Sequence, residues 1–298
     1  MFALSLARLE GAVADYTLKN LGNGVWAAIV DDAGKAGGNA GFIVGEEAVA
    51  VVDTFQDPQP AAALLADIKK ITKLPIRFVV NTHYHLDHVN GNDVFAAAGA
   101  VIVAHRNVRA WIRTENIKML DPPVTAEKKA RVASIVLPNV VHDSQIDLFL
   151  GKRRVNVRYF PGHTGGDSIV SVPDAHVVFC GDMLWKDHVP NLIDASTGPW
   201  VKSLDAMPAA YGESTWIPGH GDVANAQDVR LFRKYLADLR ASVAREQAAG
   251  KSGDALVKPL LANLRSEYGK WGFFDDYAAA DIQQTAEELA GKKRLPGH

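Results

Sequence analysis

The sequence is poor in cysteine, since Cys180 is the only one among its 298 residues. A single thiol cannot close a disulfide within the chain, so the fold does not rest on a disulfide framework. A zinc site built from several thiolates is excluded for the same reason. Any metal site in this chain has to use other ligands.

The sequence also lacks an excess of charge of either sign, because 32 lysines and arginines face 34 acidic residues and the formal net charge is -2. Proteins that bind nucleic acid or anionic membranes through broad electrostatics carry a basic surplus. We therefore predict no nucleic-acid partner.

Long apolar runs are missing as well, and no stretch reaches the roughly 18 uncharged apolar residues of a membrane span. The opening "MFALSLARLEGAVADY" has no basic residue before its apolar part, which Arg8 and Glu10 interrupt, so a signal peptide is not predicted. We expect a cytoplasmic protein without membrane association. A periplasmic location stays open if a leader has been removed.

What the sequence does contain is a series of short apolar runs, each bounded by glycine, proline or aspartate, which is typical of buried strands. In the first half we expect strands at 25–30, 41–44, 48–53 and 77–80. The stretch 58–71, "PQPAAALLADIKKI", predicts an amphipathic helix opened by prolines. A strand, helix, strand unit follows.

The second half continues with helices and then turns rich in strands. We expect helices at 92–99, 106–113 and 125–134, and strands at 100–104, 145–150, 155–160, 168–172, 176–180 and 214–218. From about residue 224 the sequence is helical. This order predicts an α/β fold in which two sheets pack face to face under outer helices, a four-layer αβ/βα sandwich. We predict one domain over 1–298, with 225–298 its mostly helical part; residues 250–298 as a separate appendage are the alternative.

The densest chemical signal is "NTHYHLDH" at 81–88, which follows the apolar run "IRFVV". Imidazole and carboxylate groups suit zinc, iron or manganese. On an extended segment the side chains of His83, His85 and Asp87 point one way and that of His88 the other. We expect two neighbouring metals, one held by His83 and His85 and the other by Asp87 and His88.

Two ligands are too few for each metal, so others must arrive from elsewhere in the chain. His163 in "FPGHTGGDS", Asp182 in "VVFCGDML" and His220 in "WIPGHGD" lie beside glycines at the ends of apolar runs, where the backbone can bend around a metal. Asp182 is the natural bridge, because each of its oxygens can face one cation. The remaining histidines are expected to be solvated: His105, His142, His176, His188 and His298.

On these residues the chain resembles the metallo-β-lactamase-fold hydrolase superfamily, whose pattern is "HxHxDH" followed by a histidine, a bridging aspartate and a final histidine. The resemblance covers roughly residues 20–225. It implies that His83, His85 and His163 bind one metal, that Asp87, His88 and His220 bind a second, and that Asp182 lies between them. The fold it implies is the same four-layer sandwich.

Two zinc ions sharing a water would lower its pKa toward about 7 and supply a metal-bridging hydroxide without a serine or cysteine nucleophile. The metals would also stabilise the developing oxyanion. Asp87 can orient the nucleophile by accepting its proton in a hydrogen bond. We therefore predict a hydrolase that acts on a small ester, lactone, thioester or β-lactam.

The substrate is less well specified. The chain has Asp182 where one subclass of zinc β-lactamases has a cysteine. In this respect it is similar to lactonases, thioesterases and phosphodiesterases of the fold. The stretch "WKDHVPNLIDASTGPWVKSLDAM" nevertheless resembles the segment in which zinc β-lactamases present a lysine and an asparagine, here Lys186 and Asn191, to the substrate. Both observations fit a promiscuous β-lactamase activity. The alternative function is a mononuclear-iron persulfide dioxygenase of the same fold.

Other residues have two interpretations each. Asp53, at the end of "AVVDT", is either a carboxylate that supports a metal ligand or a simple helix N-cap or turn aspartate. The glycines of "AGKAGGNAGF" predict a hairpin that can overhang the metals. The apolar pattern near the C-terminus predicts core, a wall of the pocket or the contact of a homodimer.

Overall fold

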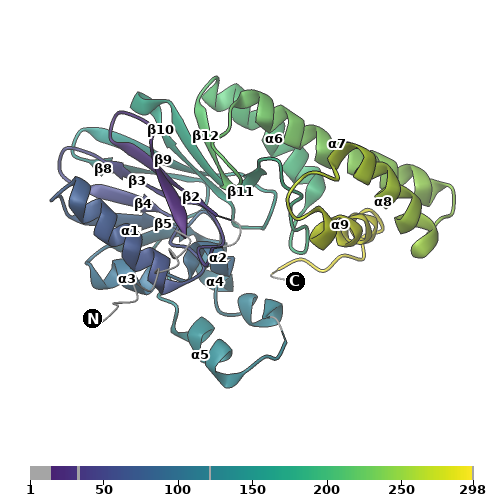
Figure 1. Cartoon of the computed structure of the whole chain (residues 1–298), viewed down its shortest axis with the longest axis horizontal. Coiled ribbons are helices and arrows are strands. Elements are labelled where there is room, and N and C mark those ends of the chain that lie inside the picture. The colour runs from purple at the N-terminus through teal and green to yellow at the C-terminus, as the bar shows by residue number, and fades with distance from the viewer. Residues whose placement is uncertain (1–14, 32–33, 121, 297–298) are drawn as a thin grey trace, which may run out of the picture.

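The computed structural model describes residues 15–31, 34–120 and 122–296, and its centre is a pair of sheets that lie face to face (Figure 1). The opening stretch considered as a signal peptide, residues 1–14, and His298 lie outside the described residues. The helices fall on the outer faces of the sheets, so the four-layer αβ/βα sandwich predicted from the sequence is confirmed.

The first sheet has seven strands in the order of the sequence. They are β1 (Tyr16–Asn20), β2 (Val25–Val30), β3 (Ala40–Val44), β4 (Val49–Val52), β5 (Ile76–Val80), β6 (Val101–His105) and β7 (Val140–His142). The pairs from β1 to β4 are antiparallel and those from β4 to β7 are parallel. Parallel strands end at the same edge of a sheet, and the loop with "NTHYHLDH" leaves that edge after β5.

The second sheet has five strands in the order β12-β11-β10-β9-β8. Their bounds are β8 (Gln145–Leu150), β9 (Arg153–Tyr159), β10 (Ser168–Val172), β11 (Val177–Trp185) and β12 (Thr215–His220). Only β11 and β12 are parallel among these neighbours. Their common end carries Asp182 and His220, two of the predicted metal ligands.

Between the sheets lies a core made of aliphatic side chains, which explains why the strands read as short apolar runs. Val25, Ala50 and Val80 of the first sheet pack against Val155 and Val170 of the second, and all five are fully buried. Burying such side chains contributes roughly 25 cal/mol per Å² of apolar surface. This core fixes the distance between the two strand edges that carry the metal ligands.

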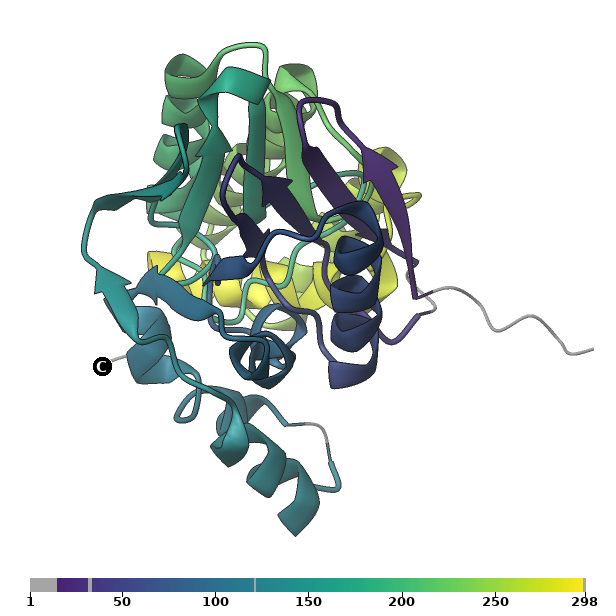
Figure 2. The ribbon, with the colours of Figure 1, turned by 90° about the vertical axis from the view of Figure 1, so that its left-hand side faces the viewer.

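Short helices and one long helix cover the first sheet and its loops. The long helix α1 (Pro58–Ile71) begins where the Asp57 side chain accepts a hydrogen bond from Gln59 N, and it buries Leu64 and Ile68 against the sheet. The others are α2 (Leu86–Val89), α3 (Asn92–Ala97), α4 (Arg106–Trp111), η1 (Asn116–Met119), α5 (Ala126–Ser134) and, in the second half, η2 (Pro173–Ala175). The segment that carries α5 extends away from the sheets (Figure 2).

Helices α6 (Thr197–Tyr211) and α7 (Ala226–Ala248) lie against the outer face of the second sheet, and α8 (Asp254–Tyr268) and α9 (Phe274–Leu289) pack against α7 and each other (Figure 1). A capping box between Asn225 and Asp228 starts α7. Buried side chains of these helices, such as Trp200, Leu236 and Ile282, share one apolar cluster with β11. That one domain spans 1–298 stays a prediction, and this shared cluster is in its favour.

The structure differs from the sequence predictions in several places. The helix α6 was not predicted, nor were β1 and β7. The strands β11 and β12 run on to Trp185 and His220, past the ends expected for them. No helix in the described ranges combines the length and the apolar character of a membrane span.

Candidate metal centre

The predicted ligands meet at the edge where the two sheets face each other. His83 and His85 lie in the loop after β5, and Asp87 and His88 lie in the short helix α2 that follows. His163 comes from the loop between β9 and β10, Asp182 lies within β11, and His220 ends β12. Segments far apart in the sequence therefore supply one cluster.

The seven side chains form two groups that share Asp182. We name the first ligand group His83, His85, His163 and Asp182, and the second ligand group Asp87, His88, Asp182 and His220. Within each group one ligand atom per residue lies within 4.8 Å of all the others. Each group offers three side chains besides the shared carboxylate, as the sequence predicts.

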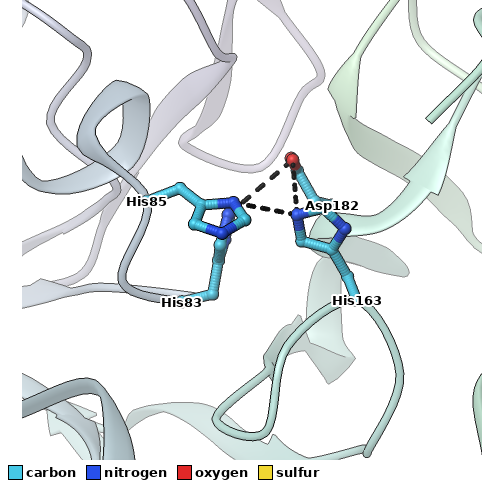
Figure 3. A group of neighbouring side chains, drawn as sticks. All are labelled: His83, His85, His163 and Asp182. Carbon is cyan, nitrogen blue, oxygen red and sulfur yellow. Dashed lines mark hydrogen bonds and ion pairs between the residues drawn. The ribbon is translucent and has the colours of Figure 1, made fainter. Parts of the chain in front are cut away.

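In the first ligand group the side chains point toward one another (Figure 3). Asp182 Oδ2 lies 3.3 Å from His163 Nε2 and 3.7 Å from His83 Nε2. His85 presents Nδ1, which is 3.0 Å from His163 Nε2. The other ring nitrogen of His85 is thereby free to contact a supporting group.

In the second ligand group two carboxylates face two imidazoles. His88 Nε2 lies 3.1 Å from Asp182 Oδ1 and 3.4 Å from Asp87 Oδ2. His220 Nε2 lies 3.3 Å from Asp87 Oδ2 and 3.4 Å from Asp182 Oδ2. Asp182 thus contacts both ligand groups, with Oδ1 near His88 and Oδ2 near His83, His163 and His220.

The sequence correctly divided His83 and His85 from Asp87 and His88, but the reason given, the alternation of side chains along a strand, was wrong. An extended segment through 83–88 would alternate its side chains, but α2 begins at Leu86 with His85 as its N-cap. His83 and His85 lie in extended or irregular backbone, and Asp87 and His88 are helical neighbours about 100° apart around the axis. The start of the helix, not strand parity, separates the pairs.

The donor set fits divalent cations. His83 Nε2, His88 Nε2, His220 Nε2 and Asp182 Oδ1 are buried and make no well-aligned hydrogen bond within the described part of the chain. Buried polar atoms that lack hydrogen bonds cost free energy, and metal coordination removes that cost. Imidazole and carboxylate ligands with no thiolate suit zinc, iron or manganese.

The two groups differ in their electrostatics. Burial lowers the pKa of His83 well below its usual range and that of His163 to about 3, so both are neutral and able to bind a metal. Burial acts in the same direction on His88 and His220, but the carboxylates of Asp87 and Asp182 outweigh it. They raise the pKa of His88 well above its usual range and that of His220 to about 9. The second ligand group therefore attracts positive charge.

Glycines leave room for the cluster on two sides. A Cβ added to Gly38 would lie 2.5 Å from His88 Nε2, and a Cβ added to Gly219 would overlap Asp182 Oδ1. Gly38 belongs to the hairpin that was hypothesised to overhang the metals, and this contact places its backbone against the second ligand group. Next to it, Asn39 Nδ2 donates to Pro218 O at 2.9 Å and Gly221 O at 2.8 Å. Asn39 thus joins the first sheet to the ligand-bearing end of the second.

Asp53 supports the second ligand group from behind. Its Oδ2 lies 2.9 Å from His88 Nδ1 and accepts a hydrogen bond from Thr82 Oγ1 at 2.7 Å, and its Oδ1 accepts one from Thr82 N at 2.8 Å. The helix that follows is capped by Asp57 instead, so the N-cap interpretation of Asp53 was wrong. A carboxylate behind an imidazole fixes its orientation and makes it a stronger ligand.

Asp194 supports the first ligand group in the same way and was not predicted from the sequence. Its Oδ2 lies 3.1 Å from His85 Nε2 and accepts a hydrogen bond from the Tyr84 hydroxyl. Asp194 lies in a loop between β11 and α6, and no motif marks it. The only available signal was its position in the chain between Asp182 and His220.

The loop that carries His163 is closed by another buried aspartate. Asp167 accepts hydrogen bonds from Thr164 N, Thr164 Oγ1 and Gly162 N, at 2.9, 2.6 and 3.1 Å. These bonds hold the "GHTGGD" turn around His163, which is fully buried. The sequence "HTGGD" therefore encodes the position of the ligand as well as the ligand.

Tryptophans flank both ligand groups. The Trp185 ring stacks on His220 with centroids 3.9 Å apart, and Trp200 meets His163 edge-on at 5.4 Å. Two aromatic residues from the C-terminal part lie beside the second ligand group. The ring centroid of Phe273 is 5.9 Å from that of His220 and 5.8 Å from that of Tyr277. Burial and the nearby Asp87 carboxylate raise the pKa of Tyr277 to about 12. The start of α9 is thus close to the second ligand group.

The two predicted substrate contacts have other partners in the structure. Lys186 Nζ donates to Val223 O at 2.8 Å and lies 3.6 Å from an oxygen of Asp228. Asn191 Oδ1 accepts a hydrogen bond from Ile193 N at 2.9 Å. These contacts do not bring either side chain into the two ligand groups.

Two histidines expected to be solvated are buried instead. The exposed fractions of His105 and His142 are 5% and 6%, and His105 stacks on Tyr159 with centroids 4.4 Å apart. Burial lowers the pKa of His142 to about 4, so it is neutral near pH 7. Both residues end strands whose last side chains turn inward, which single residues in a sequence do not reveal.

Comparison with known proteins identifies the family of the chain. Residues 33–239 match the profile described as "Metallo-beta-lactamase superfamily". The chain belongs to this superfamily. The match includes all seven members of the two ligand groups.

Relatives within the superfamily are hydrolases. The chain is 26% identical over 267 residues to a hydroxyacylglutathione hydrolase of Brucella anthropi, covering 84% of this chain and 92% of that protein. It is 22% identical over 279 residues to a linear primary-alkylsulfatase of a Pseudomonas species, covering 76% of this chain but only 52% of that protein. The chain is therefore a metal-dependent hydrolase, as predicted.

A solved structure agrees on the fold. A metallo-beta-lactamase from Pontibacter korlensis superimposes with a TM-score of 0.63 at 18% identity, covering 74% of this chain and 99% of that one. At this identity the likeness concerns the fold alone.

Proposed function

We propose that the protein is a dinuclear zinc hydrolase that cleaves a small thioester or ester. The observation that carries this proposal is the pair of ligand groups joined by Asp182, each with three further histidine or aspartate ligands. Two cations bound this closely would activate a water for attack on a carbonyl carbon at neutral pH. In this proposal His83, His85 and His163 hold one zinc, and Asp87, His88 and His220 hold the other.

The side chains of the centre have separate roles. Asp87 is ionised, since the neighbouring His88 and His220 hold its pKa well below the usual range despite its burial. Its side chain is still 23% exposed, more than Asp182 at 2%, so it can accept a hydrogen bond from a nucleophilic water and orient it. Asp53 and Asp194 fix the rings of His88 and His85. We propose no general base beyond Asp87.

A thioester is favoured because hydroxyacylglutathione hydrolases match the chain over most of both sequences. A lactone or β-lactam presents a similar carbonyl, so weak promiscuous β-lactamase activity is part of the proposal. A contact between substrate and Lys186 or Asn191 stays a prediction and would require Lys186 to leave Val223 and Asp228. The small-molecule partner, the homodimer and the cytoplasmic location stay predictions as well.

The experiment combines metal analysis with a substrate panel. Protein purified without added metal is analysed for zinc and iron, then assayed with a hydroxyacylglutathione thioester, an alkyl sulfate and a chromogenic β-lactam. We expect about two zinc per chain and the fastest turnover with the thioester. A single iron with sulfite formed from a glutathione persulfide would establish the dioxygenase alternative and overturn the proposal.

A further inference from the structure

The segment 192–198, which contains Asp194, is held by residues from the C-terminal end of the chain. Asp194 is the carboxylate behind His85, so the position of this segment decides the orientation of a metal ligand. Ser196 N donates to Gly162 O at 2.8 Å, and the other contacts of the backbone are with α9 and the residues that follow it, about 90 to 100 positions further along the chain.

Lys293 binds the segment on both sides of Asp194. Its ammonium donates to Leu192 O at 2.5 Å and to Ala195 O at 2.6 Å. Burial lowers the pKa of Lys293, although the nearby Glu288 and Asp281 act against this. Leu192 O also accepts a hydrogen bond from Ala195 N at 3.1 Å, so the half-buried ammonium of Lys293 reinforces a turn that the backbone already closes and supplies a donor to Ala195 O.

Two carboxylates of α9 bind the backbone at the ends of the same segment. Asp281 Oδ1 accepts a hydrogen bond from Leu192 N at 3.3 Å. Glu288 accepts bonds from Thr197 N at 3.0 Å, Thr197 Oγ1 at 2.6 Å and Gly198 N at 3.2 Å. The segment is therefore fixed before, around and after Asp194.

We propose that Lys293 is a positioning residue for the first ligand group, acting through Asp194 on the ring of His85. The inference rests on the proposed metal centre and assigns part of its geometry to the C-terminal residues. Without the ammonium, Ala195 O loses this donor, Leu192 O keeps the bond from Ala195 N, and the turn relaxes. Asp194 then holds the His85 ring less firmly, and His85 Nδ1 meets the metal in a poorer orientation. The second ligand group, supported by Asp53, is unaffected.

The test is cobalt binding, followed by the visible absorption of the bound ion, in Lys293→Met and in the matched control Lys292→Met. Lys292 is exposed and adjacent in the chain. The cobalt equivalent that belongs to the first ligand group is identified as the one weakened in His85→Gln. We expect its dissociation constant to rise about 3- to 10-fold in Lys293→Met, below the 10- to 100-fold typical of direct supporting residues. The control should bind like the parent protein.

A double-mutant cycle with Asp194→Asn separates positioning from general destabilisation. If Lys293 acts through Asp194, adding Lys293→Met to Asp194→Asn leaves the cobalt affinity within about twofold of Asp194→Asn alone, and Lys293→Arg restores most of the affinity of the parent. An unchanged affinity in Lys293→Met, or losses that multiply in the double variant, would overturn the proposal. If Lys293→Met does not fold by circular dichroism, Lys293→Gln is measured in its place. Cobalt binding that behaves as expected without thioester turnover would defeat only the proposed function.

Discussion

The two ligand groups are built alike but are supported from different parts of the chain. Each has a carboxylate behind one imidazole and a tryptophan beside another: Asp53 and Trp185 for the second ligand group, Asp194 and Trp200 for the first. Asp53 follows β4 and stands 35 positions from His88, whereas Asp194 is 109 positions from His85. The support of His88 is local to the first sheet, as is that of His83 through Thr82 Oγ1 at 3.1 Å, whereas the support of His85 comes from a loop that contacts the C-terminal helices.

Charge sharpens this contrast. The second ligand group has two carboxylates and two imidazoles, and the pKa values of both imidazoles are raised. The first has one carboxylate and three imidazoles, and burial lowers the pKa values of His83 and His163. A group rich in carboxylate binds cations by charge, and a group rich in neutral imidazole binds them by its lone pairs. If the two groups are supported separately, a substitution beside one group should lower its metal affinity more than that of the other.

The largest effect is expected where the groups meet. Asp182→Asn removes the charge of the shared carboxylate, so both groups lose metal affinity and the second loses more. We expect its affinity to fall about 100-fold and turnover at least 10-fold. Zinc content after dialysis and turnover measure this, with the exposed Asp254→Asn as the control. Unchanged zinc content and activity would show that Asp182 does not bridge.

A smaller effect should be confined to one group. Asp53→Asn keeps a residue type that tolerates the positive φ of 58° at this position, but it replaces the charge behind His88. We expect metal affinity of the second ligand group to fall about 10-fold and that of the first by less, because Thr82 Oγ1, which donates to Asp53, also lies 3.1 Å from His83 Nδ1. Asp194→Asn is the matched variant and should show the reverse pattern. Cobalt titrations of both that gave the same pattern would show that the groups are not supported separately.

The smallest effect concerns the tryptophans. Trp185→Phe removes the hydrogen bond from the indole to Asp182 O, 3.0 Å long, and reduces the ring stacked on His220. Aromatic pairs contribute about 0.5–1.5 kcal/mol, so metal affinity of the second ligand group should fall about 3-fold. Trp200→Phe, which loses a 3.1 Å bond to Met183 O, should act on the first group by a similar amount. If both variants weaken the same group, the tryptophans do not belong to separate groups.

Much of the fold could be predicted because most of its inner strands are buried on both faces, while β8 has the alternation of a strand with one exposed face. The helix at 58–71 and the strands at 25–30, 145–150 and 168–172 have the predicted bounds. The helix α6 was missed because Pro199, Pro208 and the "STG" before it interrupt its pattern, while its stability comes from side chains such as Trp200 that pack on the second sheet. Local sequence does not report that tertiary contribution.

The ligands could be predicted because metal binding demands specific residue types at specific places in the chain. Their supports could not, because the chemistry of a supporting carboxylate is satisfied by any aspartate that the fold brings near. Asp194 is one of many aspartates in loops, and tertiary contacts, among them those of Tyr84, Lys293 and α9, hold it near His85. The burial of His105 and His142 could not be predicted either, because it too depends on contacts between elements far apart in the chain.

The hydrogen bonds of Asn39 have a consequence for the order of folding. They join the connection before β3 to residues 218 and 221 at the end of the second sheet, beside Gly38 and Gly219. Ligands from both sheets meet there only after the sheets have docked, so the complete centre is a product of docking and cannot guide it. A metal ion that binds afterwards would stabilise the docked state by RT ln(1 + [L]/Kd), about 2.7 kcal/mol at a free concentration 100 times Kd. The rise in melting temperature on adding metal therefore measures how far the metal stabilises the docked sheets.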